Sequence, residues 1–256
     1  MKLNDSNRDI DRLKNVYKSF NEAQDGYNEN TYTTLRDDIL IFKQDTEKRL
    51  VKIIRESFNG DIKKLTVLEV GTGWGQRFRS FLDMGFESSN LYGIDLLQNF
   101  IESARKWSGD LNFICGDAQN LPYENDSFDI VFQCVAFSSI IDRNIIKNIC
   151  SEMIRVVKDD GIIIWIDFGI KGQKKYYEGT QYLQSIELNE IKSFFPDCNM
   201  KFENKIYLKP FFWKICNHKD KYNKILYKFF SNFNLCKSHY VIVLKKNTKD
   251  NAQSIK

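Results

Sequence analysis

A glycine-rich turn lies between a short apolar run and the start of a helical pattern. It reads Val67-Leu68-Glu69-Val70-Gly71-Thr72-Gly73-Trp74-Gly75. Glycine lets the backbone turn sharply and lets a ligand lie against bare main chain, and the amide groups of a helix start face such a ligand. Asp95 ends the next apolar run, where a carboxylate accepts hydrogen bonds from both hydroxyls of a ribose. These residues leave two ligands open, a nicotinamide dinucleotide and S-adenosylmethionine.

The spacing of the glycines separates these two ligands. The dinucleotide pattern is G-x-G-x-x-G, whose third glycine packs the helix on the strand. Gln76 and Arg77 follow Gly75 here, so that pattern fails. A nicotinamide-dependent oxidoreductase is therefore disfavoured, and a glycine turn that holds no ligand is a third interpretation.

Strands and helices alternate around the turn, which implies an α/β fold with a parallel sheet and right-handed crossovers. Apolar runs and periodicity predict strands at 65–70, 90–94, 111–115, 128–135, 161–167, 199–208 and 240–244. Helices are predicted at 7–20, 35–58, 97–107, 142–157, 186–195 and 210–230, with one ending at Leu82 and a loop or lid at 169–180. We expect a helical N-terminal cover (1–60), a cofactor-binding core (61–168), a substrate-side portion with the final strands (169–246) and a frayed tail (247–256).

Composition and charge limit the function classes. The 256 residues carry a net charge of +4, with 42% hydrophobic residues, which argues against wholesale disorder. No apolar stretch approaches the length of a membrane span, and the first residues lack the apolar core of a secretory signal. Six cysteines without C-x-x-C spacing predict reduced thiols in a cytoplasmic protein and no zinc site. Residues 201–256 hold 13 Lys against three acids, which favours an anionic substrate, a contact with an anionic membrane surface, or simply a solvated lysine face.

A second acidic strand end resembles a known family. Phe113-Ile114-Cys115-Gly116-Asp117-Ala118 is followed by Leu121-Pro122-Tyr123 and Ser127-Phe128-Asp129-Ile130-Val131-Phe132. With the glycine turn and Asp95, this arrangement resembles class I S-adenosylmethionine-dependent methyltransferases. The resemblance implies a Rossmann-like sheet of seven strands, mostly parallel, whose last strand runs antiparallel between the fifth and sixth. Asp160-Gly161 stands where the family usually has Pro-Gly.

The resemblance also implies the residues that bind S-adenosylmethionine. Asp95 would bind the ribose, Asp117 and Ala118 the adenine, and Gln133 and Cys134 the methionine end. The full set expected at the cofactor is Glu69, Gly71, Thr72, Gly73, Gly75, Asp95, Leu96, Asp117, Ala118, Gln133 and Cys134.

A narrower resemblance concerns the substrate. Phe137-Ser138-Ser139-Ile140-Ile141, Ile164-Trp165-Ile166-Asp167-Phe168 and His239-Tyr240 look like methyltransferases encoded among bacterial surface-polysaccharide genes. Those proteins usually carry an Asn-Pro-containing loop after the Asp-Phe pair, whereas Gly169-Ile170-Lys171-Gly172 follows here. The resemblance therefore implies O-methylation of a small sugar-type or phosphorylated acceptor in surface-polysaccharide biosynthesis. The different loop leaves open that the substrate differs from theirs, and nucleic acid is disfavoured.

The same fold predicts where a catalytic base lies. Asp167 ends the fifth strand and His239 begins the last, so both are expected at the edge where ligands bind. We hypothesise that His239 is the general base for O-methylation, oriented by Asp167; the alternative is a packed strand residue beside a loop cap. Tyr27 and Ser138 are weaker candidates for acceptor contacts. Besides the oxidoreductase, a methyltransferase-fold binding protein without catalysis remains open, and neither a metal site nor an oligomeric state is predicted.

Overall fold

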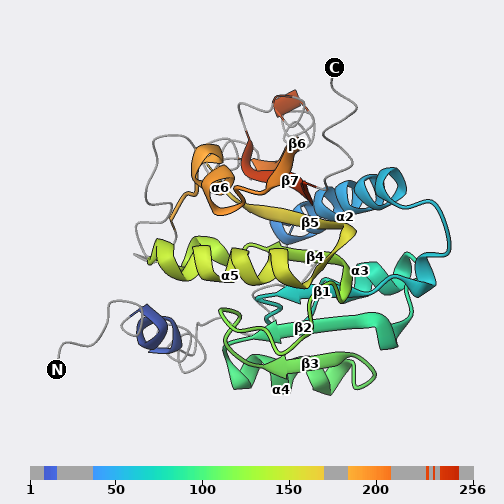
Figure 1. The fold of residues 1–256 in the computed structure, drawn as a ribbon. Helices are drawn as coiled ribbons and strands as arrows, with labels where there is room; N and C mark the ends of the chain where they lie inside the picture. The colour runs from blue at the N-terminus through green and yellow to red at the C-terminus, as the bar shows by residue number, and fades with distance from the viewer. Residues whose placement is uncertain are drawn as a thin grey trace.

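Seven strands form one sheet in the computed structural model, which describes residues 9–15, 37–169, 184–208, 229–230, 233 and 237–247. The strand order is β3-β2-β1-β4-β5-β7-β6 (Figure 1). The strands are β1 (Val67–Val70), β2 (Leu91–Asp95), β3 (Asn112–Cys115), β4 (Phe128–Cys134), β5 (Val157–Phe168), β6 (Cys198–Leu208) and β7 (Lys237–Lys246). Neighbours among β1 to β5 pair in parallel, which confirms the expected α/β class.

The last strand lies where the family resemblance places it. β7 pairs antiparallel with β5 on one side and with β6 on the other. The beginning of β7 therefore lies at the same edge of the sheet as the end of β5. That edge is where ligands bind in open α/β sheets.

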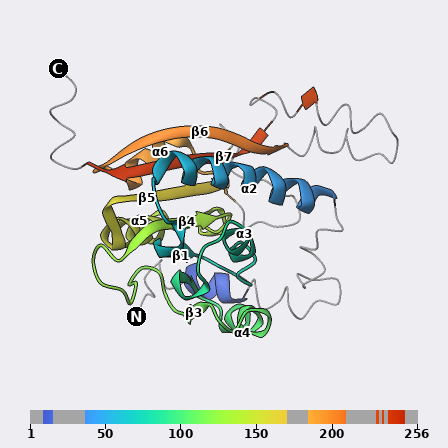
Figure 2. The same cartoon turned by 90° about the vertical axis from the view of Figure 1, so that its right-hand side faces the viewer.

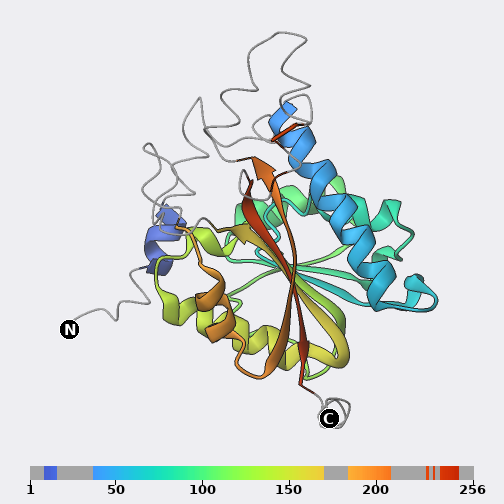
Figure 3. The same ribbon diagram turned by 90° about the horizontal axis from the view of Figure 1, so that it is seen from above.

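Helices cover both faces of the sheet, and apolar side chains bury each interface (Figures 2 and 3). On one face lie α2 (Asp37–Ser57), α3 (Phe78–Asp83) and α4 (Gln98–Trp107); on the other lie α5 (Arg143–Val156) and α6 (Leu188–Phe194). Short 3-10 helices η2 (Ile62–Lys64), η3 (Ser88–Asn90) and η4 (Phe137–Ser139) occupy connections. The fold is thus a three-layer arrangement with the sheet in the middle.

Local sequence explains how α5 begins and which side it buries. The Asp142 carboxylate accepts a hydrogen bond from the Asn144 N–H and so satisfies one of the unpaired donors of the first turn. Its buried residues recur at helical spacing: Ile145, Ile146, Ile149, Cys150, Met153 and Val156. This stripe packs on β4 and β5 and fixes the position of the chain that follows β4.

The fifth strand begins earlier than the sequence predicts. The structure starts β5 at Val157, directly after α5, instead of at Gly161. The pairing with β4 shifts between Phe128 and Ile130, which accommodates the extra residues. Gly161 lies so close to the Asp129 carbonyl that a Cβ atom would be 2.8 Å from the oxygen. The glycine at this position is therefore required by packing against β4.

Several predictions concern residues outside the described ranges. These are Tyr27, most of the loop at 169–180, the helix at 210–230 and the tail beyond residue 247. Within the described residues, Cys115, Cys134, Cys150 and Cys198 are free thiols, and no helix there has the length and apolarity to cross a bilayer.

Candidate functional site

The glycine turn connects β1 to α3 and is closed by hydrogen bonds to the neighbouring strand. The N–H groups of Gly71 and Thr72 donate to the Ile94 carbonyl at 2.9 and 3.1 Å. Gly71 and Gly73 have φ angles of +74° and +53°, a region that side-chain-bearing residues rarely adopt. A Cβ on Gly71 would lie 2.5 Å from the Ala136 Cβ, whereas one on Gly73 would meet nothing within 4 Å. Gly71 therefore serves packing, and Gly73 leaves open space for a ligand against the backbone.

Asp95 faces the same turn from the end of β2. One carboxylate oxygen accepts from the Gly73 N–H at 2.8 Å, and the other accepts from the Leu97 N–H at 3.0 Å. Burial raises the pKa of Asp95 to about 6, although the hydrogen bonds from Gly73 and Leu97 act in the opposite direction. The carboxylate is thus held rigidly beside the glycines, in the place expected for binding a ribose.

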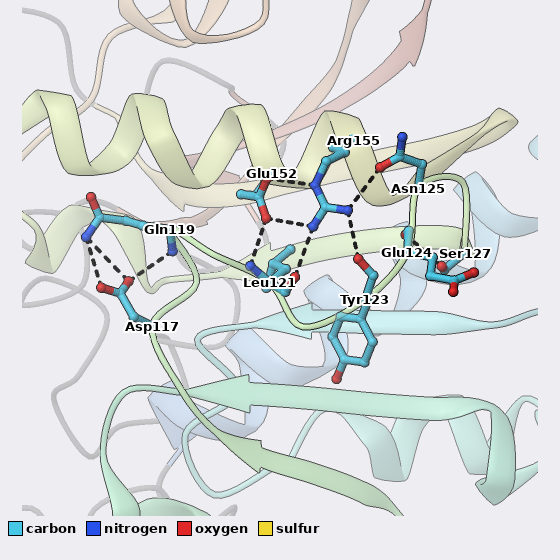
Figure 4. Close-up of polar contacts among 9 residues, drawn as sticks. All are labelled: Asp117, Gln119, Leu121, Tyr123, Glu124, Asn125, Ser127, Glu152 and Arg155. Atoms are coloured by element: carbon cyan, nitrogen blue, oxygen red, sulfur yellow. Dashed lines mark hydrogen bonds and ion pairs between the residues drawn. The ribbon is translucent and has the colours of Figure 1, made fainter.

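Asp117 follows β3 in a loop that α5 holds in place (Figure 4). The carboxylate accepts from the Gln119 N–H at 2.9 Å, which forms a tight turn. Further along, Glu152 accepts from the Leu121 N–H at 2.8 Å, and Arg155 donates to the Leu121 carbonyl at 2.9 Å. Arg155 also pairs with Glu152 at 2.7 Å. This network on α5 fixes the loop and thereby the position of Asp117.

Glu69 is a buried carboxylate on β1. Its side chain accepts a hydrogen bond from the Thr72 hydroxyl at 2.8 Å, and the residue is 1% exposed. Burial raises its pKa to about 8, while the Thr72 hydrogen bond and the positive charge of Arg77 partly offset that effect. A cationic ligand group beside Glu69 would favour its charged form.

A cavity of about 790 Å³ joins these residues. Its walls come from the ends of β1, β2, β3 and β4, from α2 and α5, and from the helix of residues 9–15. Nine of the eleven predicted cofactor residues line it: Glu69, Gly71, Thr72, Gly73, Asp95, Leu96, Asp117, Ala118 and Cys134. The site predicted from the sequence is thus a single cavity.

The other two predicted cofactor residues do not line the cavity. Gly75 packs inside the fold, since a Cβ there would lie 2.5 Å from the Phe113 ring. Gln133 is fully buried, and its side-chain oxygen accepts from the Ala136 N–H at 3.3 Å. Both residues support the walls. Of the candidates for acceptor contacts, Ser138 is buried outside the cavity lining and Tyr27 lies outside the described residues.

The cavity extends past the glycine turn to a region that the sequence analysis missed. Phe42 of α2 lines it together with Arg77, whose guanidinium carbon lies 5.1 Å from the centre of the Phe42 ring. Cys134 and Val135 contribute the end of β4. Burial raises the pKa of Cys134 to about 11, with the charge of Arg77 acting in the opposite direction. We call Phe42, Arg77, Cys134 and Val135 the Arg77 end of the cavity.

The predicted pairing of His239 with Asp167 is wrong. The register of β5 and β7 places Asp167 opposite Tyr240, and His239 opposite Phe168. Because successive side chains of a strand point to opposite faces, the carboxylate and the imidazole leave opposite faces of the sheet. Neither residue lines the cavity. Strand order brought the two positions together as expected, but the one-residue difference in register separates their side chains.

Each of the two residues has other contacts. Asp167 accepts from the N–H groups of Phe137 at 2.9 Å and Ser138 at 3.1 Å, and burial raises its pKa to about 6. The ring of His239 lies 5.3 Å from that of Phe42, and burial lowers its pKa to about 3, with a smaller effect from Arg77. His239 is thus neutral near pH 7.

The cavity lining carries charges of both signs. Three carboxylates, those of Glu69, Asp95 and Asp117, line it together with four basic side chains: Lys43, Arg77, Arg79 and Lys106. The charge of the lining by itself therefore does not separate a dinucleotide from S-adenosylmethionine. The carboxylates offer acceptors for the hydroxyls of a ribose and for the positive groups of a ligand. The fold is Rossmann-like, with its cavity at the carboxyl ends of the parallel strands.

Comparisons with known proteins show which proteins this chain is similar to. Residues 68–165 match the family model described as "Methyltransferase domain". The chain is 31% identical over 140 residues to a demethylmenaquinone methyltransferase of Thermotoga maritima, covering 54% of this chain and 57% of that protein. It is 24% identical over 163 residues to a malonyl-[acyl-carrier protein] O-methyltransferase of Halorhodospira halophila, covering 62% of this chain and 50% of that protein. The chain thus spans about half the length of these curated relatives.

A solved structure agrees with the fold. An S-adenosylmethionine-dependent methyltransferase from Clostridium acetobutylicum superposes with a TM-score of 0.57 at 13% identity, covering 86% of this chain and 99% of that chain. Residues 68–165 are thus similar to a methyltransferase domain, and S-adenosylmethionine is the cofactor that the comparisons support.

Proposed function

We propose that the chain is an S-adenosylmethionine-dependent methyltransferase that acts on a small anionic acceptor. The single observation behind this proposal is that one cavity joins a carboxylate-lined cradle for the cofactor to a second end with a half-buried cation, Arg77. The bound cofactor supplies an activated methyl group. The protein then mainly has to align an acceptor with it.

The residues of the Arg77 end favour an acceptor that needs little help from a base. Among the described residues there, Cys134 is a neutral thiol at neutral pH because burial raises its pKa to about 11. His239 and Asp167 lie outside the cavity lining. A carboxylate acceptor is already ionised at neutral pH, and a phenol or an enol ionises more easily where a cation stabilises its anion. Arg77 would stabilise that anion, and Phe42 would pack against its apolar part.

The names of the relatives bear on the acceptor. Demethylmenaquinone and malonyl-[acyl-carrier protein] stand in the names of two matched proteins. The surface-polysaccharide acceptor expected from the narrower resemblance has no support from these names. We therefore propose an acidic acceptor with an apolar portion, methylated on oxygen or carbon.

The test separates cofactor binding from acceptor recognition. Calorimetric titration with S-adenosylhomocysteine checks the cradle, and transfer of labelled methyl to a panel of phenols, carboxylic acids and neutral alcohols checks the acceptor. We expect Arg77→Gln to raise the acceptor KM at least about 10-fold, because a hydrogen bond to a charged group contributes roughly 1.5–3 kcal/mol. Arg77→Lys should recover part of the loss.

Arg55→Gln is the matched control, since Arg55 is an exposed arginine of α2 outside the cavity lining. Equal weakening of S-adenosylhomocysteine and of the acceptor by Arg77→Gln would assign Arg77 to the cofactor instead. Cofactor binding without methyl transfer to any acid would favour the binding-protein alternative.

A further inference from the structure

The segment between β4 and α5, residues 135–142, forms one wall of the cavity. Val135, Ala136, Phe137, Ser139 and Ile140 all line it. The segment begins with an unusual backbone, because Val135 has a φ of +59°. A β-branched residue rarely adopts this conformation, and such strain persists only where the surroundings enforce it. The residues that hold this segment therefore matter for the shape of the cavity.

One holding contact comes from the neighbouring strand. The Asp167 carboxylate accepts from the backbone N–H groups of Phe137 and Ser138 at 2.9 and 3.1 Å. Its second oxygen accepts from its neighbour Phe168 at 2.7 Å. This contact links the end of β5 to η4, because Asp167 is the residue before the last of β5 and both amides belong to η4.

A second holding contact comes from the helix of residues 9–15. One Asp9 oxygen accepts from the backbone N–H groups of Ile141 and Asp142, both at 2.8 Å. Arg12 pairs with the other Asp9 oxygen at 2.6 Å and donates to the Ser139 carbonyl at 2.7 Å. In Figures 1 and 3 this helix, coloured dark blue, lies at the edge where α5 begins. Asp9 is 6% exposed, so these bonds are shielded from water.

The same helix also contributes to the cavity wall. Ile10 and Leu13 line the cavity, and Leu13 belongs to the core cluster that includes Ile145 and Ile149 of α5. A ligand in the cavity thus contacts both the helix and the segment that Asp9 holds. Residues more than a hundred positions apart are joined here through three charge-assisted hydrogen bonds.

We propose that Asp9 is a positioning residue that couples docking of the N-terminal helix to cofactor binding. Asp9 fixes the Ile141 and Asp142 amides, which sets the wall formed by residues 135–142. Docking of the N-terminal helix then raises the affinity for the cofactor, and by thermodynamic linkage the bound cofactor stabilises the docked helix by the same free energy. This inference rests on the proposed function only for the identity of the cofactor.

The experiment compares Asp9→Asn with Asp11→Asn in the full-length chain. Asp11 is an exposed aspartate of the same helix, so the second variant controls for the loss of one negative charge. S-adenosylhomocysteine affinity is measured by calorimetry, and hydrogen exchange of the peptide covering residues 137–142 is followed by mass spectrometry with and without that ligand. We expect Asp9→Asn to weaken binding by about 10-fold and to speed exchange in this peptide, with Asp11→Asn unchanged in both.

Reciprocity gives a second readout. In the wild type, S-adenosylhomocysteine should slow exchange in residues 9–15 as well as in 137–142, and in Asp9→Asn the protection of 9–15 should shrink. Arg12→Gln, which loses the bond to the Ser139 carbonyl, should act in the same direction, and circular dichroism should show both variants folded.

The outcomes separate this inference from the proposed function. A wild type that binds no S-adenosylhomocysteine overturns the proposed function, while faster exchange of 137–142 in ligand-free Asp9→Asn still supports the positioning role. A wild type that binds, with Asp9→Asn equal to Asp11→Asn in affinity and exchange, overturns the coupling and leaves the proposed function standing.

Discussion

The two ends of the cavity are built in different ways. The end at the glycine turn consists of that turn and of carboxylates at the ends of successive strands, Asp95 and Asp117. Each group lies within a few residues of a strand end, and backbone N–H groups hold both carboxylates. The Arg77 end instead gathers Phe42, Arg77 and Cys134 from α2, from the turn before α3 and from β4.

This difference separates the binding of groups that all adenosyl ligands share from the binding of one particular acceptor. Every ligand with an adenosine can use a backbone cradle with a ribose-binding acid, because the cradle reads only groups common to such ligands. The acceptor is read by side chains that come from separate elements. Substitutions at the first end should therefore abolish binding of any adenosyl ligand, whereas those at the second should change which acceptor reacts.

The largest effect is expected at Asp95. Asp95→Ala should weaken S-adenosylhomocysteine at least about 100-fold, because paired hydrogen bonds to a charged group are worth roughly 1.5–3 kcal/mol each at most. Titration calorimetry measures the loss, with the exposed Asp110→Ala as control. Asp95→Asn, which keeps the size and one acceptor oxygen, should retain part of the affinity. An unchanged affinity in Asp95→Ala would remove this residue from the cradle.

Glu69 makes the cofactor affinity depend on pH. Its pKa of about 8 leaves it largely protonated at pH 7, and a cationic ligand favours the charged form. Affinity should therefore rise roughly 5- to 10-fold between pH 7 and about pH 8.5. Proton release on binding at pH 7, measured by calorimetry in buffers of different ionisation enthalpy, checks this directly. Glu69→Gln should remove the release.

The ligand-free protein should show the corresponding stability change. A carboxyl whose folded-state pKa is raised binds more protons when folded, so its contribution to stability is lost as pH rises from its unfolded value through the folded one. For Glu69, stability is therefore lost over the pH range from its ordinary pKa of 4.5 to its folded-state pKa of about 8. Denaturant titrations across this range should show a smaller fall in Glu69→Gln than in the wild type.

Val135 belongs to the Arg77 end, and the expected effect there is the smallest. Val135→Gly relieves the φ of +59°, whereas Val135→Ala keeps the strain and removes the same methyl groups. The glycine variant should be more stable than the alanine variant by about 1 kcal/mol, since left-handed backbone costs roughly 1–2 kcal/mol for residues with a Cβ. Chemical denaturation measures the difference. A glycine variant no more stable than alanine would show that Val135 is unstrained.

Much of the fold was predictable because its signals are local. Buried strands appear as short apolar runs and helices as periodic ones, and the structure confirms the parallel pairing that their alternation predicts. It also confirms the antiparallel last strand between the fifth and sixth, which the family resemblance implied. The start of β5 was missed because its first residues, Lys158, Asp159 and Asp160, are charged and lie outside any apolar run. Their pairing depends on a register shift against β4, which no local pattern reveals.

The failure at His239 and Asp167 has the same origin. Topology places both residues at one edge of the sheet, but the face that each side chain takes depends on register. In the sequence, Arg77 is only a residue that breaks the dinucleotide pattern, and Phe42 is one of many residues of the helix predicted at 35–58. Their meeting requires the packing of α2 against the sheet, which is a tertiary fact.

By itself, the amino-acid sequence determined the alternation of strands and helices, the glycine turn and the acids at strand ends. Those features depend on backbone conformation and on periodic burial, which neighbouring residues encode. Only the tertiary structure decided which faces of the sheet the polar side chains of β5 and β7 occupy. It also decided that Arg77 lies beside Phe42 in the cavity, and that the carboxylates of Asp9 and Asp167 hold residues 135–142. Such contacts join segments far apart in the chain, and their geometry follows from register and packing rather than from local sequence.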